Sequence, residues 1–271
     1  MWDSPTWHEL LRHGRKGTLH LTGLHSDGNV YAIVRQAASQ GVTRCRLHIL
    51  LYGRNVGARS AQLYIEATEK VLAEINADHD VDFRIASGGG RMTITMDRYG
   101  ADWPMVERRY NAHTHGIGRQ FPTAAEAVDV FYEESDASDP KPKGDQYLDA
   151  FIVADDGEPI GVMADGDSVL LWNFRGDRAI EVSQAYESAN FDAFDRGDHP
   201  DVYYAGLLQY DGDLGSRSLQ LAVLVMFLSA GIYTVAILIR SRSMSMQIPF
   251  GPFMALGYVA GVLVAGPEAI V

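Results

Sequence analysis

The sequence has almost no cysteine and no long run of basic residues. Cys45, the single cysteine, lies in the strand-like segment RCRLHILL; it can form no disulfide bond within the chain, and we expect a buried structural thiol. Lysine and arginine number 23 against 35 aspartates and glutamates, a net charge of −12. Because phosphate neutralisation needs clustered basic residues, this balance argues against nonspecific nucleic-acid binding. A small anionic metabolite needs only a few converging arginines, so the charge is compatible with one.

Signatures of several common functions are missing as well. The sequence contains no Gly-x-Ser-x-Gly, Cys-x-x-Cys or His-Glu-x-x-His motif. In the turn Ser26-Asp27-Gly28, no neighbouring residue in the sequence would activate Ser26 as a nucleophile. His113 and His115 would share a face only in a strand, whereas the surrounding residues have helical periodicity, so we do not expect a metal pair there.

The N-terminus also lacks the pattern of a secretory signal peptide. MWDSPTWHELLRHGRKG has an early aspartate and no apolar run. Its DSPTWHELL segment instead predicts an N-capped amphipathic helix at the entry to a domain. The chain has 271 residues, of which 46% are apolar, so it is long enough for one large domain or two ordinary ones with a real core.

Short apolar runs alternate with helix-period segments from Thr18 to about Tyr210. The expected strands are TLHLTGL, RLHILL, DFRIAS, DAFIV, SVLLWNF and VYYAGLLQY. Between them, residues 59–75 predict a helix, with one face formed by Leu63, Ala67, Val71, Leu72 and Ile75. Residues 135–146 read as a polar, proline-containing loop, and DDGEP as an Asp-Gly turn. This alternation predicts an α/β fold, a mostly parallel sheet flanked by helices.

Arginines follow three of the predicted strands. They lie in the glycine-rich segment SGGGRMTITMDRY, in NFRGDRAI and in LLYGRNVGARS, and they are Arg91, Arg98, Arg175, Arg178 and Arg54. Glycine lets a backbone approach a ligand closely, and guanidinium groups bind carboxylate or phosphate through two hydrogen bonds. Because open α/β sheets bind ligands at the carboxyl ends of their strands, these arginines predict an anionic substrate. The alternative is a set of solvated arginines paired with local acids such as Asp177.

The composition changes abruptly after Asp213. Leu219 to Ile239 contains no charged residue and is long enough to cross about 30 Å of hydrocarbon as a helix. Ile248 to Ala265 is a second uncharged run, and together the two predict a C-terminal transmembrane helical hairpin over 219–265. The alternative is a buried helix pair. Arg240 and Arg242 in the connecting segment favour a cytoplasmic loop, which would place the N-terminal domain outside, whereas the missing signal peptide favours a cytoplasmic domain.

Five segments carry a resemblance to a known family. They are LHLTGLHSDGNV, ASGGGRMTITMDRYGADWPMVER, DGDSVLLWNFRGDRAIEVSQA, FDAFDRG and YYAGLLQYDGDL, in this order. Over about residues 5–214 they resemble the substrate-binding, or phosphotransferase, domain of the cofactor-independent (2,3-bisphosphoglycerate-independent) phosphoglycerate mutases. The resemblance implies a cytoplasmic glycolytic isomerase that converts 3-phosphoglycerate to 2-phosphoglycerate, with a serine nucleophile and two manganese ions in a separate phosphatase-like domain.

The resemblance also implies the residues that would bind substrate. Arg91, Arg98, Arg175 and Arg178 fall on the substrate-gripping arginines of the family, and Arg54 and Asn55 fall on the last two positions of its Asp-Gly-Arg-Asp loop. That loop reads here Tyr52-Gly53-Arg54-Asn55, so both carboxylates are replaced. After SDGNV the sequence also lacks the histidine-containing segment usual in the family. No catalytic or metal-binding residue is implied for this chain, so phosphoglycerate binding at most is expected of it alone.

Residues 218–271 resemble a different family, the C-terminal end of the prepilin (type IV leader) peptidases. The catalytic Gly-x-Gly-Asp motif of those membrane proteases is absent, so we do not expect proteolysis. The sequence thus predicts a mutase-like α/β domain over 1–214 and a two-helix membrane segment over 215–271 that contacts the lipid bilayer. Two alternatives are a membrane-anchored, non-enzymatic or vestigial fusion protein and a recombined reading frame with no selected function.

Overall fold

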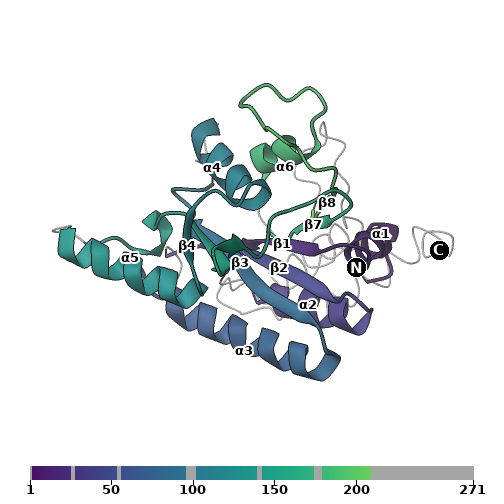
Figure 1. Cartoon of the computed structure of the whole chain (residues 1–271), viewed down its shortest axis with the longest axis horizontal. Helices are drawn as coiled ribbons and strands as arrows, with labels where there is room; N and C mark the ends of the chain where they lie inside the picture. The colour runs from purple at the N-terminus through teal and green to yellow at the C-terminus, as the bar shows by residue number, and fades with distance from the viewer. Residues whose placement is uncertain are drawn as a thin grey trace, which may run out of the picture.

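The structure is a computed structural model that describes residues 2–25, 28–53, 56–95, 102–138, 142–173 and 179–208. These residues form an eight-stranded sheet with helices on both faces (Figure 1). The strands are β1 (Leu19–Leu24), β2 (Arg44–Leu51), β3 (Asp82–Gly90), β4 (Arg119–Phe121), β5 (Phe151–Asp155), β6 (Glu158–Pro159), β7 (Ser168–Leu171) and β8 (Tyr203–Gly206). The helices are α1 (Pro5–Gly14), α2 (Asn29–Ser39), α3 (Ala61–His79), α4 (Trp103–Thr114), α5 (Ala124–Ser138), the 3-10 turn η1 (Asp145–Tyr147) and α6 (Ile180–Glu187).

The strand order is β4-β5-β3-β2-β1-β7-β8, with β6 paired to β5. The neighbouring strands β3, β2, β1, β7 and β8 all run parallel to one another. Strand β5 runs antiparallel to β3 and parallel to β4. The predicted α/β fold with a mostly parallel sheet is therefore confirmed. Each of the six predicted strands overlaps an observed one, but the short strands β4 and β6 were not predicted.

Local sequence explains how several elements begin and end. The Ser4 hydroxyl accepts a hydrogen bond from the Trp7 backbone N–H at 3.2 Å, which caps α1 as the DSPTWHELL segment predicted. Asp102 caps α4 in the same way through Met105. Asp156 and Gly157 both have positive φ, the geometry that a two-residue hairpin between β5 and β6 requires, so the predicted Asp-Gly turn is confirmed.

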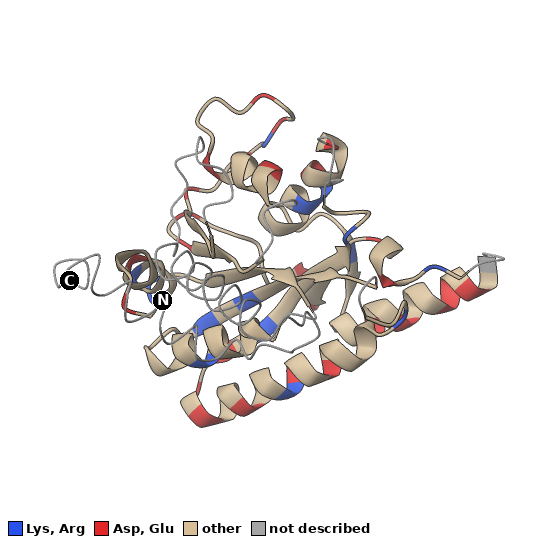
Figure 2. Cartoon of the chain, turned by 180° about the vertical axis from the view of Figure 1, so that it is seen from behind, with Lys and Arg blue, Asp and Glu red and all other residues tan. Residues whose placement is uncertain are grey.

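Two expectations about helices were wrong. The buried face of α3 is formed by Ala61, Ile65, Thr68, Leu72 and Ile75. Leu63 is 66% exposed and Ala67 also faces solvent, since they lie on a neighbouring strip of the helix surface. Residues 135–138 are the last turn of α5 and not part of a loop. Aspartates and glutamates recur along the outer surfaces of α3 and α5, as the net negative charge requires (Figure 2).

Each face of the sheet has its own core. Helices α1, α2, α3 and α5 pack against one face through a large apolar cluster that includes Trp7, Leu21, Leu47 and Trp172. Helices α4 and α6 cover the opposite face, where Tyr110, Tyr186 and Tyr204 belong to a smaller cluster. That second face also buries polar side chains of β1 and β2. The sheet therefore separates an apolar layer from a partly polar one.

Within the described part of the chain, no helix has the length and apolarity needed to span a membrane. The predicted hairpin over 219–265 lies outside the described residues, as does the rest of the tail from residue 209.

Candidate functional site

The carboxyl ends of the parallel strands meet at one edge of the sheet. His25 follows β1, Tyr52 follows β2, Arg91 follows β3 and Asn173 lies two residues after β7. Backbone hydrogen bonds join these ends, from the His25 N–H to the Leu50 carbonyl and from the Arg91 N–H to the Leu51 carbonyl, each at 3.1 Å. The Asn173 side-chain oxygen accepts from the Leu24 N–H at 3.1 Å. These four residues therefore lie at one edge of the sheet, the edge at which open α/β sheets bind their ligands.

Arg91 is the predicted site residue that the structure describes, and it is held by two neutral groups. Its Nε and one terminal nitrogen both donate to the Oε1 atom of Gln146, at 3.0 and 2.9 Å. Its guanidinium carbon lies 4.7 Å from the centre of the Tyr52 ring, in the range of a cation–π contact. The side chain is 6% exposed. Neither of these two contacts involves an acid, so each orients the guanidinium without adding a counter-charge of its own.

The glycine-rich segment has a different role from the one the sequence suggested. Gly88, Gly89 and Gly90 belong to β3 itself and pair with Ile49, Leu50 and Leu51 of β2. A Cβ atom on Gly90 would lie 2.5 Å from the Gln146 backbone, and one on Gly88 would lie 2.5 Å from the Phe151 ring. These glycines therefore make room for protein neighbours and not for a ligand. Close approach at Gly90 is what brings Gln146 to Arg91.

Asp145 fixes the segment that presents Gln146. Its fully buried carboxylate accepts from the Ser60 N–H at 2.8 Å and from the Tyr132 hydroxyl, while its own N–H donates to the Ala58 carbonyl at 2.7 Å. Burial, together with the hydrogen bond to Asp145, raises the pKa of Tyr132, so the phenol stays protonated and donates. The turn η1 is thus tied to the loop that follows β2.

The other predicted site residues, Arg54, Asn55, Arg98, Arg175 and Arg178, lie outside the described residues, as does Ser26. Their sequence neighbours Gly53 and Asn173 lie at the same sheet edge as Arg91. Arg91 alone among these residues is described, so the predicted convergence of arginines at one edge stays a prediction.

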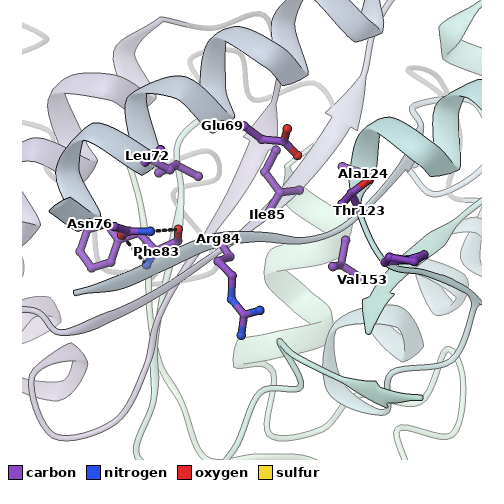
Figure 3. A pocket seen from close by; sticks show the side chains of 11 residues that line it. Glu69, Leu72, Asn76, Phe83, Arg84, Ile85, Thr123, Ala124 and Val153 are labelled. Atoms are coloured by element: carbon purple, nitrogen blue, oxygen red, sulfur yellow. Dashed lines mark hydrogen bonds between the residues drawn. The ribbon is translucent and has the colours of Figure 1, made fainter. Parts of the chain in front are cut away.

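A separate pocket opens on the opposite half of the sheet (Figure 3). It lies between α3 and the start of α5 and is lined by Glu69, Leu72, Phe83, Ile85, Thr123 and Val153, among others. The Asn76 amide beside it is occupied by the Phe83 backbone, at 2.9 and 3.0 Å. The Arg84 side chain points away from it toward Asp155. The lining includes the Glu69 carboxylate, and the guanidinium of Arg84 is paired with Asp82 and Asp155, so this pocket is not the candidate site for an anion.

A buried polar chain crosses the second face of the sheet. Asp167 accepts from His20 Nε2 at 3.1 Å, His20 Nδ1 lies 2.9 Å from His48 Nε2, and His48 Nδ1 lies 2.7 Å from the Ser87 hydroxyl. The connectivity resembles that of a serine hydrolase, but all four residues are at most 5% exposed. Ser87 is closed to a substrate, so these four hydrogen-bonded side chains serve to join neighbouring parts of the sheet.

Burial sets the protonation states of these hydrogen-bonded side chains and of the neighbouring His113. It lowers the pKa of His20, which the hydrogen bond to Asp167 opposes, and it lowers the pKa values of His48 and His113 well below the usual value. Burial raises the pKa of Asp167, but hydrogen bonds from His20, Thr18 and Ala164 outweigh that effect and leave this pKa below its usual value. The three histidines are therefore neutral, and Asp167 is ionised.

His113 and His115 do not face a common point. His113 Nδ1 lies 2.9 Å from the Tyr186 hydroxyl, whereas His115 Nε2 donates to the Arg196 carbonyl at 2.9 Å. Among the described residues, no group of three or more histidines, cysteines, aspartates or glutamates is arranged to hold a metal ion.

The sequence reasoning missed Gln146, His20 and His48. Gln146 stood in a segment read as a loop, and no local signal connects it to Arg91, 55 residues away. The two histidines had a usable signal. They alternate with apolar residues in the predicted strands TLHLTGL and RLHILL, which places both on one face of a buried sheet.

Comparisons with known proteins agree with the resemblance over most of the chain. The family model described as the N-terminus of 2,3-bisphosphoglycerate-independent phosphoglycerate mutase matches residues 1–212. A Leptospira interrogans protein named as a probable enzyme of this kind is 50% identical over 224 residues, which are 79% of this chain and 40% of that protein. One from Trypanosoma brucei brucei is 49% identical over 206 residues, 73% of this chain and 36% of that protein.

A solved structure gives the same result for the fold. Leishmania mexicana phosphoglycerate mutase, crystallised at low cobalt concentration, is 44% identical with a TM-score of 0.73, over 79% of this chain and 40% of that one. The chain thus spans about 40% of the length of these relatives. The match to the family model ends at residue 212, so it does not bear on the prepilin peptidase resemblance of 218–271. From this match and these identities, the chain belongs to the 2,3-bisphosphoglycerate-independent phosphoglycerate mutase family and covers the N-terminal portion that the family model describes.

Proposed function

We propose that residues 1–214 form a substrate-binding domain that holds phosphoglycerate at the carboxyl edge of its sheet. The observation that carries this proposal is Arg91, a buried guanidinium at the end of β3 that two neutral side chains orient. Arg54, Asn55, Arg98, Arg175 and Arg178 would complete the site, as the family resemblance implies. A phosphorylated three-carbon acid carries two anionic groups, which several guanidinium forks at one edge would bind in a defined orientation.

Within the family reaction, this domain would hold the glycerate and not transfer the phosphoryl group. The resemblance places the serine nucleophile and two manganese ions in a second domain. Positioning without a nucleophile leaves a phosphoryl group with no acceptor. We therefore expect the isolated chain to form no 2-phosphoglycerate from 3-phosphoglycerate in the presence of Mn²⁺. Detectable conversion would overturn this part of the proposal.

Binding is tested by titration calorimetry of the full chain with 3-phosphoglycerate. The parent chain should release or absorb heat, and Arg91→Ala should lose at least tenfold in affinity. Arg12→Ala is the matched control, because Arg12 is exposed on α1 and pairs with Glu9. No heat from the parent would overturn the proposed function. Equal affinities of the parent and Arg91→Ala would remove Arg91 from the site.

We also propose that residues 215–271 attach the chain to a lipid bilayer through a hairpin over 219–265. The support is the uncharged run from Leu219 to Ile239 and the shorter one from Ile248. In that case the protein is a membrane-anchored member of the family, enzymatic or not. The full chain should then sediment with membranes and resist carbonate extraction. Release by carbonate would contradict the hairpin and leave phosphoglycerate binding unaffected.

A further inference from the structure

The contacts of Arg91 come from two distant parts of the sequence. Tyr52 follows β2 and supplies a ring face, and Gln146, in η1, supplies one oxygen to two guanidinium nitrogens. We propose that Tyr52 and Gln146 are positioning residues that hold the Arg91 guanidinium for an anionic substrate, and we call these three residues the Arg91 clamp. The inference rests on the proposed function and deepens it, because it assigns Tyr52 and Gln146 a role in substrate affinity.

The chemistry of the two partners matters because both are uncharged. A carboxylate at either position would orient the guanidinium equally well, but it would also offset its charge and compete with the anionic ligand. An amide oxygen accepts the same two hydrogen bonds without a net charge. A tyrosine ring attracts the cation through its negative face, again without a counter-charge. Tyr52 and Gln146 therefore orient the guanidinium without contributing a negative charge.

Tyr52 has a particular significance at its position. The Asp-Gly-Arg-Asp loop of the family reads here Tyr52-Gly53-Arg54-Asn55, so an aromatic ring stands where the resemblance implies an acid. The replacement is not a simple loss, because the ring lies 4.7 Å from the guanidinium carbon of Arg91. In this chain we assign the first position of the loop to the support of a neighbouring arginine.

Gln146 is held rigidly enough to perform this role. The adjacent Asp145 is fully buried and accepts hydrogen bonds from the Ser60 N–H and the Tyr132 hydroxyl. The Gln146 carbonyl accepts from the Met92 N–H at 2.9 Å, and the Leu148 carbonyl accepts from the Gly90 N–H at 2.9 Å. The residues on both sides of Arg91 are thereby joined to the backbone of Gln146 and Leu148. Little rotamer entropy is left to lose when a ligand binds.

The experiment uses the full chain, 3-phosphoglycerate as the titrant and four variants. Tyr52→Phe keeps the ring and should bind within about twofold of the parent, whereas Tyr52→Leu removes the ring and should lose about tenfold in affinity. Gln146→Glu keeps the shape and both hydrogen bonds but adds a charge, so affinity should fall at least tenfold. Gln62→Glu is the control, because Gln62 on α3 makes its contacts with Ala125 and Asp129 of α5.

Thermal unfolding of the same variants separates positioning from a merely structural role. A charged hydrogen bond to Arg91 should leave the Tm of Gln146→Glu equal to or above that of the parent while its affinity falls. A residue important only for folding would move both quantities in the same direction. If the parent binds and Tyr52→Leu and Gln146→Glu bind equally well, the clamp is overturned and the proposed function survives. If the parent gives no heat, the proposed function fails and the clamp fails with it.

Discussion

His20 and His48 share a hydrogen bond across two neighbouring strands, with His20 Nδ1 2.9 Å from His48 Nε2. The carboxylate of Asp167 accepts from His20 Nε2, so in the neutral ring the Nδ1 atom of His20 must accept. His48 therefore donates through Nε2, and its Nδ1 accepts from the Ser87 hydroxyl at 2.7 Å. Hydrogen-bond donation therefore runs in one direction, from Ser87 through His48 and His20 to Asp167. This order works only while both imidazoles are neutral.

This arrangement predicts loss of stability in mild acid. Burial lowers the pKa values of His20, His48 and His113, so the unfolded chain takes up protons at a higher pH than the folded one. Stability is then fully present above the unfolded value of about 6.5 and is lost as pH falls below it. Each imidazole can contribute a slope on the order of 1 kcal/mol per pH unit. Urea unfolding between pH 7.5 and 5 measures the total slope.

A histidine variant tests which groups take up these protons. Glutamine at position 48 can donate to His20 and accept from Ser87 but cannot titrate. His48→Gln should therefore reduce the proton uptake on unfolding by about one between pH 7 and 5. His8→Gln, at an exposed position of α1, should keep the parent slope. An unchanged slope in His48→Gln would show that His48 is not among the groups responsible.

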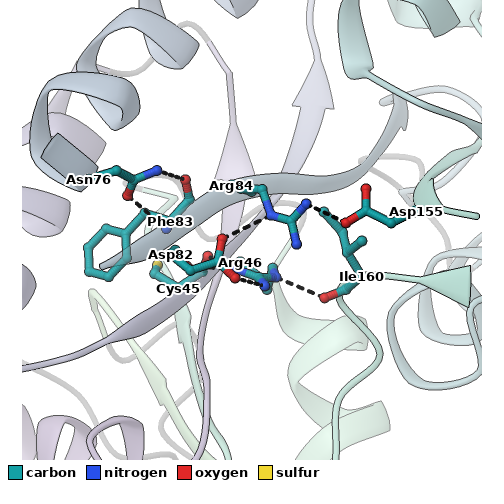
Figure 4. A network of polar contacts seen from close by, with 8 residues as sticks. All are labelled: Cys45, Arg46, Asn76, Asp82, Phe83, Arg84, Asp155 and Ile160. Carbon is teal, nitrogen blue, oxygen red and sulfur yellow. Dashed lines mark hydrogen bonds and ion pairs between the residues drawn. The ribbon is translucent and has the colours of Figure 1, made fainter. Parts of the chain in front are cut away.

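The contacts of Arg46 predict a large loss of stability when its side chain is truncated (Figure 4). Its side chain is 2% exposed, pairs with Asp82 at 2.5 Å and donates to the carbonyls of Ile160 and Asp82 at 2.8 and 2.7 Å. Arg46→Met would leave these acceptors without their donor, at a cost of about 3 kcal/mol in the free energy of unfolding. Arg12→Met removes an exposed ion pair with Glu9 and should leave the urea midpoint nearly unchanged. Similar midpoints for the two variants would contradict this account.

The sequence predicted the strands well because a buried parallel strand has a strong local signal. β1, β2 and β7 are rich in leucine and almost entirely buried, and their order with the intervening helices indicated the fold class. It failed where a distant partner decides the conformation. Gly88 to Gly90 were placed after the predicted strand, yet they pair with β2 as part of β3. Phe151 and Gln146 occupy the space that side chains at Gly88 and Gly90 would need.

For the candidate site, the sequence proposes residues but does not predict the contacts that orient them. A single sequence shows that Arg91 follows a strand, and a family resemblance assigns it a ligand. Neither indicates that Gln146 holds it, because that contact joins two segments 55 residues apart. From the sequence, Tyr52 indicates only that a carboxylate of the family loop is replaced. The structure adds that its ring contacts the guanidinium of Arg91. Contacts of this kind depend on tertiary packing, which leaves no periodic pattern in the sequence.

The observed face of α3 predicts opposite results for two apolar residues two positions apart. Ile65 is fully buried against the sheet, and Ile65→Ala should cost about 2 to 4 kcal/mol in the free energy of unfolding. Leu63 is 66% exposed, so Leu63→Ala should change it by less than about 0.5 kcal/mol. Urea titrations followed by circular dichroism measure both. A larger cost for Leu63→Ala would restore the face that the sequence suggested.

Gly90→Ala tests the close approach between β3 and η1. The added methyl group would lie 2.5 Å from the Gln146 backbone, which cannot turn aside as a flexible side chain could, so a cost of about 1 to 3 kcal/mol is expected. Gly28→Ala is the control, since a Cβ atom there would meet nothing within 4 Å. Because Gln146 must shift, Gly90→Ala should also weaken 3-phosphoglycerate binding. Unchanged stability would mean that η1 does not rest on the strand as described.

Cys45 predicts the reactivity of the chain toward thiol reagents. The side chain is fully buried in β2, and burial raises its pKa, so both access and thiolate formation are suppressed in the folded state. Iodoacetamide at pH 8 should therefore leave the native chain unmodified over hours and alkylate it within minutes in 6 M urea, as intact mass would show. Increasing concentrations of urea below the unfolding midpoint give the sharper result. If alkylation rises only in parallel with global unfolding, β2 belongs to the most stable part of the sheet; alkylation at low urea would instead reveal local opening at the centre of the sheet and contradict the packing described for β1, β2 and β3.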